Sequence, residues 1–122
     1  MIINNQQAIL FIEPKNSATS PQPLIDSLTR KMTAAFRQRR GDKDVMNGFH
    51  ICACGVCSDS SLHFLPNGQE TNSLCIHYLA YHRSEVPIEE LAKVEQLNCG
   101  EAEPTEEEMK DPLKYRLFPP RN

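Results

Sequence analysis

The chain has little aromatic content and no Trp. Phe and Tyr together make up 7% of its 122 residues, and all hydrophobic residues make up only 39%. Because a chain of this length buries a modest core, that core must rely mainly on Leu, Ile, Val and Met. A bound metal would compensate for such a thin core, since its binding free energy adds to folding.

Long apolar runs and targeting signals are also missing. No apolar run approaches the roughly 20 residues needed to cross a bilayer, and residues 1–11 show neither the basic start nor the cleavage site of a signal peptide. We therefore expect a cytoplasmic protein with no membrane partner. Thiols stay reduced in that compartment, and an odd number of Cys, five, fits a disulfide framework poorly. Metal ligation or reactive thiols are the better interpretations.

The chain lacks an excess of basic residues. Its formal net charge is −3, whereas a protein that binds nucleic acid through its charge would normally be basic. A local basic cluster consists of Arg37, Arg39, Arg40 and Lys43. The cluster lies at the end of a predicted helix, where basic side chains interact favourably with the helix dipole. The alternative interpretation is a patch that binds RNA or an acidic partner. We do not expect a nucleic-acid partner and expect an unidentified protein partner instead.

What the chain does contain is a dense group of Cys and His. Of its nine Cys and His residues, all but Cys99 lie in one 33-residue window. These eight are His50, Cys52, Cys54, Cys57, His63, Cys75, His77 and His82. Such density is typical of a transition-metal site, above all of zinc. The alternative is that the Cys are small buried hydrophobic side chains and the His are hydrogen-bonded polar groups.

The later part of the window places His77 and His82 five residues apart on a predicted helix. Their H-x4-H spacing lies within the range common in zinc sites. On a regular helix, however, positions five apart differ by about 140° in azimuth. Both rings can reach one ion only if the helix is distorted or frays near His82, and Ser84 and Pro87 favour fraying.

The thiol partners of these His are less sharply defined by spacing. Cys52 and Cys54 have C-x-C spacing, which puts both on one face of a strand, whereas Cys54 and Cys57 have the C-x2-C spacing of a metal-binding turn. Our expected ligands are Cys52, Cys54, His77 and His82. Further candidates are Cys57, His50 and Cys75, with His50 as a ligand or an outer contact. Cys75 is more typical of packing, and His63 is expected to be exposed.

The order of Cys early and His late on a helix resembles a C2H2 zinc finger in outline, over about residues 50–82. The gap from Cys57 to His77 is 19 residues, against roughly 12 in the finger pattern, and the helix has no basic face. We therefore do not infer DNA binding from this resemblance. The chain as a whole resembles small bacterial proteins, but that resemblance implies no activity.

The spacing of the hydrophobic residues and the positions of helix-capping and turn residues predict an α+β fold. A small antiparallel hairpin or sheet would pack against two to three helices and be stabilised by zinc. Expected strands cover residues 8–12, 48–54 and 62–65, the last closed by the Pro66-Asn67-Gly68 turn. The first helix is expected from Pro21, capped by Ser20, to Gly41. Its inward residues would be Leu24, Leu28, Met32 and Phe36.

Two further helices are expected over residues 71–83, capped by Thr71 or Asn72, and 88–97. The inward residues of the latter would be Ile88, Leu91, Ala92 and Val94. We expect a single domain over residues 1–122, with a metal-binding core at about 48–97. Residues 101–122 would form a short helix and a strand, or a C-terminal arm.

Three classes of function fit these features. The first is a structural-zinc module for interaction or regulation, which needs four protein ligands. The second is a metal-dependent hydrolase or a Cys/His thiol enzyme, which needs an open coordination position or an exposed thiolate. The zinc-deaminase and H-E-x-x-H signatures that would support it are absent. The third is a redox or metal sensor.

Overall fold

The fold is described from a computed structural model, which defines residues 8–16, 18, 22–38, 41–43, 51–58 and 62–97. His50 and Cys99 lie outside the described residues, as do the expected caps Ser20 and Pro21 and all of residues 101–122. The expectations for these positions, including the extent of the domain, stay predictions.

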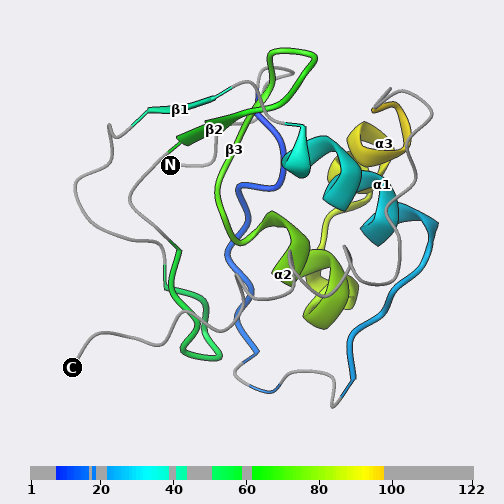
Figure 1. Cartoon of the computed structure of the whole chain (residues 1–122). Coiled ribbons are helices and arrows are strands. Elements are labelled where there is room, and N and C mark those ends of the chain that lie inside the picture. Colours follow the sequence, from blue (N-terminus) through cyan, green and yellow to red (C-terminus); the bar gives the residue numbers. More distant parts are fainter. Residues whose placement is uncertain are drawn as a thin grey trace.

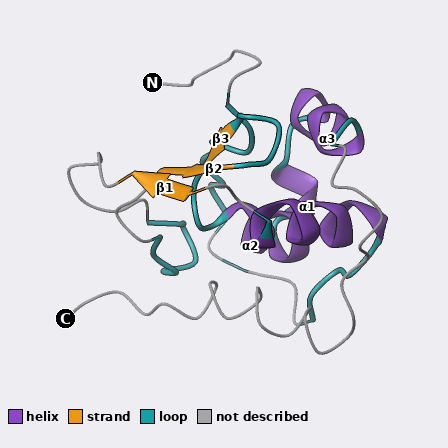
Figure 2. Cartoon of the chain, turned by 45° about the horizontal axis from the view of Figure 1, so that its top comes forward, coloured by secondary structure: helices purple, strands orange, loops and turns teal. Residues whose placement is uncertain are grey.

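Three helices and a small antiparallel sheet make up the described fold. The helices are α1 (Ser27–Arg37), α2 (Cys75–Tyr81) and α3 (Ile88–Glu95), with a 3₁₀ turn, η1 (Arg83–Glu85), after α2. The strands are β1 (Gly41–Lys43), β2 (Leu62–Phe64) and β3 (Glu70–Thr71), in the order β1-β2-β3. The sheet lies at one end and the helices at the other (Figures 1 and 2), which confirms the predicted α+β class.

The start of α1 differs from the prediction. The helix begins after Asp26, whose Oδ1 accepts a hydrogen bond from the backbone N–H of Thr29 at 3.1 Å. The same carboxylate accepts two hydrogen bonds from Arg83, at 2.6 and 2.7 Å, so a residue after α2 fixes the cap of α1. Leu24 therefore lies before the helix and is 43% exposed, which makes its predicted inward position wrong.

The other end of α1 also differs. Gln38 is the C-cap, and Gly41 begins β1 opposite Phe64 instead of ending the helix. Met32 and Phe36 are fully buried as predicted, and the helix packs against both α2 and α3. The four-residue spacing therefore identified the inward face correctly within the helix, while tertiary contacts fixed its ends.

The segment of residues 8–16 runs between the sheet and the helices (Figure 1). Ile9 and Leu10 are fully buried, as predicted, but the described part of the segment forms an isolated bridge, Ala8 to Glu70, in place of a regular strand. Leu10 has a positive φ of 60°, and its backbone N–H donates to Oε1 of Glu90 at 2.7 Å. The Glu90 side chain thus accepts the hydrogen bond of a backbone N–H group that would otherwise pair with a neighbouring strand.

Strand β2 and the turn after it follow the prediction, except at His63, whereas β3 occupies Glu70 and Thr71, where the start of a helix was expected. Gly68 has a φ of 90° and donates its N–H to the carbonyl of Leu65 at 2.8 Å, which confirms the predicted turn. His63, expected to be exposed, is only 2% exposed. It lies on the central strand of the sheet, and its ring packs against Phe36 of α1 at 5.0 Å between centroids.

Helix α3 turns only part of its expected face inward. Val94 is buried and Leu91 half-buried, but Ile88 is 76% exposed and Ala92 is also exposed. The reason is the pairing of Glu90 and Lys93 with the segment of residues 8–10, where Lys93 Nζ donates to the carbonyl of Ala8 at 2.9 Å. Residues two apart lie about 200° apart on a helix, so an inward Glu90 turns Ile88 outward.

Candidate metal centre

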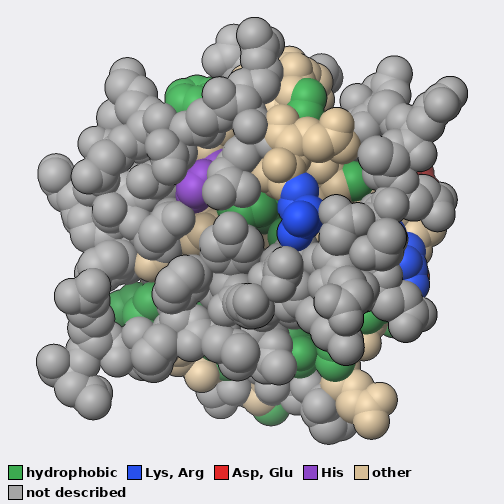
Figure 3. All heavy atoms as spheres, viewed as in Figure 1, with side chains coloured by type: hydrophobic (Ala, Val, Ile, Leu, Met, Phe, Trp, Pro, Cys, Tyr) green, Lys and Arg blue, Asp and Glu red, His purple; other side chains and the backbone are tan. Residues whose placement is uncertain are grey.

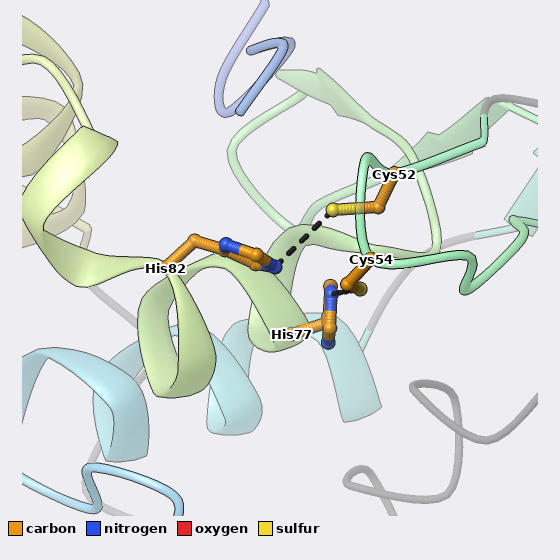
Figure 4. Close-up of side chains that lie close together, drawn as sticks. All are labelled: Cys52, Cys54, His77 and His82. Carbon is orange, nitrogen blue, oxygen red and sulfur yellow. Dashed lines mark hydrogen bonds between the residues drawn. The ribbon is translucent and has the colours of Figure 1, made fainter. Parts of the chain in front are cut away.

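Four of the Cys and His side chains meet at one place in the described structure. Each of Cys52, Cys54, His77 and His82 offers one donor atom, and these atoms all lie within 4.8 Å of one another. The thiols come from the turn of residues 51–58, and the imidazoles come from α2 and its C-terminal end (Figure 4). The four could hold a metal ion, and they are the same four that the sequence singles out.

The two thiols lie on a tight turn and not on the face of a strand, which corrects the expectation for residues 51–54. Ile51 bridges Cys57 in an antiparallel sense, and the N–H of Cys52 donates to the carbonyl of Val56 at 2.8 Å. Gly55, with a φ of 99°, donates back to the carbonyl of Cys52 at 2.8 Å. The sharp reversal turns both thiols of the C-x-C pair toward α2.

The end of α2 brings the two imidazoles together. The helix stops at Tyr81, and His82 leaves it with φ −129° and ψ 35°. The centroids of the two His rings are 4.9 Å apart, with the planes inclined at 70°. The prediction that the helix ends or frays near His82 is thereby confirmed. The helix starts later than expected, after Leu74, whose N–H donates to Oδ1 of Asn72 at 2.8 Å.

The distances between donors suit a small tetrahedral ion. Cys52 Sγ lies 3.2 Å from His82 Nε2, and Cys54 Sγ lies 3.3 Å from His77 Nε2. In a tetrahedral zinc site, sulfur and nitrogen ligands lie about 3.5 Å apart. The widest donor separation, 4.8 Å, exceeds this value by about 1 Å, which small side-chain rotations can close.

Burial affects the protonation of Cys52 and His82. His77, His82 and Cys52 are at most 3% exposed, whereas Cys54 is half-buried. Burial raises the pKa of Cys52 to about 11, so this thiol keeps its proton when no metal is bound. Burial also lowers the pKa of His82, although Glu85 nearby acts in the opposite direction. His82 is therefore neutral at pH 7 and has a ring lone pair available for a ligand bond.

Outer contacts hold both imidazoles. The ring of His77 stacks on Tyr81, with centroids 5.6 Å apart and planes at 29°. His82 Nδ1 lies 3.5 Å from Oε2 of Glu85, in η1. The other oxygen of Glu85 accepts hydrogen bonds from the backbone N–H groups of Lys15 and Asn16, at 2.8 and 3.2 Å. The N–H of Lys15 is the largest cause of a lowered pKa at Glu85.

The remaining candidate ligands do not join the cluster within the part of the chain that the structure describes. Cys57 is buried, with its Sγ facing the carbonyl of Gly55 at 3.9 Å. Cys75 is fully buried in the hydrophobic core, which agrees with the packing interpretation. His63 lies against Phe36, and His50 is outside the described residues. The surplus donors described here therefore pack within the fold.

The sequence places Glu85 beside the predicted helix as a possible general base, but it did not identify Glu85 as an outer contact of His82. Its position three residues after His82 was a usable signal, since such neighbours meet on one side of a helical turn. No sequence pattern indicates the contacts of Lys15 and Asn16 with Glu85. Both residues act through backbone N–H groups, and they lie 70 and 69 residues away from Glu85 along the chain. Asp26 and Arg83 were likewise paired across 57 residues.

The surface and the comparisons add little to the site itself. On the face drawn in Figure 3, the described Lys and Arg side chains lie apart from one another instead of forming one patch. No helix in the described residues is long and apolar enough to span a membrane. Comparison with protein-family models, with curated proteins and with solved structures gave no match.

Proposed function

We propose that Cys52, Cys54, His77 and His82 bind one Zn²⁺ ion and that this ion is structural. The observation that supports the proposal most strongly is the meeting of two thiols and two imidazoles within 4.8 Å. Thiolate and imidazole are the ligands of structural zinc, and four of them complete its tetrahedral coordination. The ion would join the turn of residues 51–58 to α2.

A filled tetrahedron has consequences for function. With four protein ligands, no position remains for the water molecule that a hydrolytic zinc site activates. A small zinc-stabilised module that acts through a protein partner is therefore a better proposal than a metalloenzyme. The two ligand thiols must stay reduced, so the proposal also favours a reducing compartment such as the cytoplasm.

A second function, redox sensing, draws support from one feature. Cys54 is half-buried, whereas the other three donors are buried, and Cys52 lies two residues away on the same turn. A peroxide that takes up two protons from water would oxidise the two thiolates to one disulfide, with release of the ion. Hydrogen peroxide would be reduced to two water molecules, and an organic peroxide to one alcohol and one water molecule. Thiol counting and zinc analysis after peroxide treatment, and again after reduction, would test this reversibility.

Metal analysis of the purified protein tests the main proposal. We expect one zinc ion per chain in protein prepared with zinc available. Cys54→Ser and His77→Ala should each weaken zinc binding by more than about 100-fold, beyond the range typical for outer-shell changes. Cys57→Ser is the matched control, because Cys57 is a buried thiol of the same turn that lies outside the four-donor group.

The outcomes separate cleanly. Wild-type zinc content in the Cys57→Ser variant, with loss of zinc in the other two, would support the proposed ligand set. Full zinc content in Cys54→Ser or His77→Ala, or no zinc in the wild-type protein, would overturn it.

A further inference from the structure

A continuous line of contacts leads from the candidate metal centre to the N-terminal segment. It begins at His82, whose Nε2 faces Cys52 and whose Nδ1 faces Oε2 of Glu85 at 3.5 Å. It ends at Lys15 and Asn16, whose backbone N–H groups donate to Oε1 of the same carboxylate. Each oxygen of Glu85 therefore serves a different part of the chain.

We propose that Glu85 is a positioning residue that orients His82 for metal binding and couples occupancy of the metal site to docking of the chain at Lys15 and Asn16. This inference rests on the proposed function, because it assumes that His82 binds the ion through Nε2. Glu85 itself does not touch the ion.

The orienting role follows from the two nitrogens of imidazole. A neutral ring carries its proton on one nitrogen and a lone pair on the other. A carboxylate accepts hydrogen bonds but donates none, so the facing Nδ1 is the atom that keeps the proton, which leaves the lone pair on Nε2. Outer carboxylates of this kind fix ring orientation and make the ligand nitrogen more basic.

The coupling role follows from the second oxygen of Glu85. Its two hydrogen bonds hold the backbone at Lys15 and Asn16, so docking of these residues and orientation of His82 restrain the same side chain. Any gain in metal affinity from the docked segment must be matched by an equal gain in docking when the metal binds.

The segment of residues 8–16 also contains an amide that can serve as a control for this coupling. The N–H of Leu10 donates to Glu90 of α3, which has no contact with the four donors in the part of the chain described here. Zinc binding should therefore slow amide exchange at residues 15 and 16 much more than at residue 10. A general stabilisation of the fold by zinc would instead protect the buried amide of Leu10 at least as strongly as the two exposed amides.

Zinc affinity, measured by competition with a chelator, tests the orienting role. Glu85→Ala removes both acceptors and should weaken zinc binding by about 10- to 100-fold. Glu85→Gln keeps one acceptor oxygen and nearly the same shape, so it should lose less affinity, and it remains informative if the Ala variant folds poorly. Glu89→Ala is the matched control, because Glu89 is an exposed acidic residue of α3, and it should stay within about twofold of wild type.

Amide hydrogen exchange of the full chain, with and without zinc, tests the coupling. In the wild-type protein, zinc should slow exchange at Lys15 and Asn16 more than at Leu10, and the Nδ1 proton of His82 should become visible by NMR. Both effects should be lost in Glu85→Ala and partly retained in Glu85→Gln.

The two proposals fail in different ways. Wild-type zinc affinity in Glu85→Ala would overturn the role of Glu85 while leaving the four-ligand site intact. Protection of Leu10 by zinc that equals or exceeds that of Lys15 and Asn16 would do the same. Absence of zinc binding by the wild-type protein would overturn the proposed function itself, and the role of Glu85 with it.

Discussion

The Nε2 atom of His82 lies 3.2 Å from the Sγ atom of Cys52, although 30 residues separate them along the chain. The contact exists because α2 stops one residue before His82 and because the turn at Gly55 reverses the chain after Cys52. Two local chain reversals thus bring a thiol and an imidazole to the spacing of ligands on one ion.

Removal of the metal should lower stability. A ligand that binds only the folded state at about a thousand times its dissociation constant stabilises it by about 4 kcal/mol. In a domain of this size, that corresponds to a rise in melting temperature on the order of 10 °C or more. Thermal unfolding of the zinc-loaded protein, before and after chelation, measures this shift. Magnesium added in place of zinc is the control, and an unchanged melting temperature after chelation would argue against a structural ion.

Zinc binding should release protons. Since burial raises the pKa of Cys52 to about 11, this thiol is protonated at pH 7 and must lose its proton to bind the ion. His82, with its lowered pKa, has no proton to release. The apparent zinc affinity should therefore rise by at least about tenfold per pH unit between pH 6 and 8. Calorimetry in buffers of different ionisation enthalpy counts the protons, and a count near zero would exclude Cys52 as a ligand.

Gly55 should matter for the metal site in a way that Gly68 does not. Both have positive φ, 99° and 90°, and at both an added Cβ would meet open space. Replacement by Ala therefore costs backbone strain alone, about 1–2 kcal/mol. In Gly55→Ala the strain falls on the turn that carries the thiols, so zinc affinity should drop by about tenfold. Gly68→Ala should lower the free energy of unfolding but leave zinc affinity unchanged. Equal zinc affinities for the two variants would contradict this view of the turn.

The pair of Asp26 and Arg83 should make stability depend on acid. Hydrogen bonds from Arg83, together with that from Thr29, hold the pKa of Asp26 well below its usual range. Because the carboxyl group has a lower pKa in the folded state, its ionisation stabilises the fold. This stabilisation is complete above the unfolded-state pKa of about 4 and is lost progressively as the pH falls below that value. At pH 7, Asp26→Asn should cost about 1–2 kcal/mol, since Asn can still cap the helix but does not carry the charge. Asp26→Ala should cost about 1 kcal/mol more.

Urea unfolding of metal-free protein at pH 7 and pH 3 measures this effect without interference from zinc release. The difference between wild type and Asp26→Asn should shrink at the lower pH. A difference that stays constant across this range would show that the charge of Asp26 contributes nothing.

The sequence was most informative where chemistry and local geometry coincide. His77 and His82 could be assigned to one helix that ends near His82, because Ser84 and Pro87 predict its termination. The Asn67-Gly68 turn was equally predictable, since Gly68 supplies the positive φ. In both cases the deciding residues lie within a few positions of the structure that they determine.

The sequence was least informative where distant residues compete for the backbone. Glu90 takes the N–H of Leu10, so the buried segment does not become a regular strand. Arg83 fixes the cap of α1 at Asp26, and β2 becomes a central strand that buries His63. Neither spacing nor propensity encodes contacts across such separations. The sequence left open whether Cys52 and Cys54 lie on a strand or on a turn, because alternation of side chains suits a strand as well as a tight reversal.

X-ray absorption at the zinc edge of the purified protein tests the central claim most directly. The four-donor site predicts two sulfur ligands at about 2.3 Å and two nitrogen ligands at about 2.0–2.1 Å, with no oxygen ligand. One zinc ion per chain with this shell is the result that we expect. A shell that contains oxygen, a different ratio of sulfur to nitrogen, or protein that takes up no zinc would contradict it.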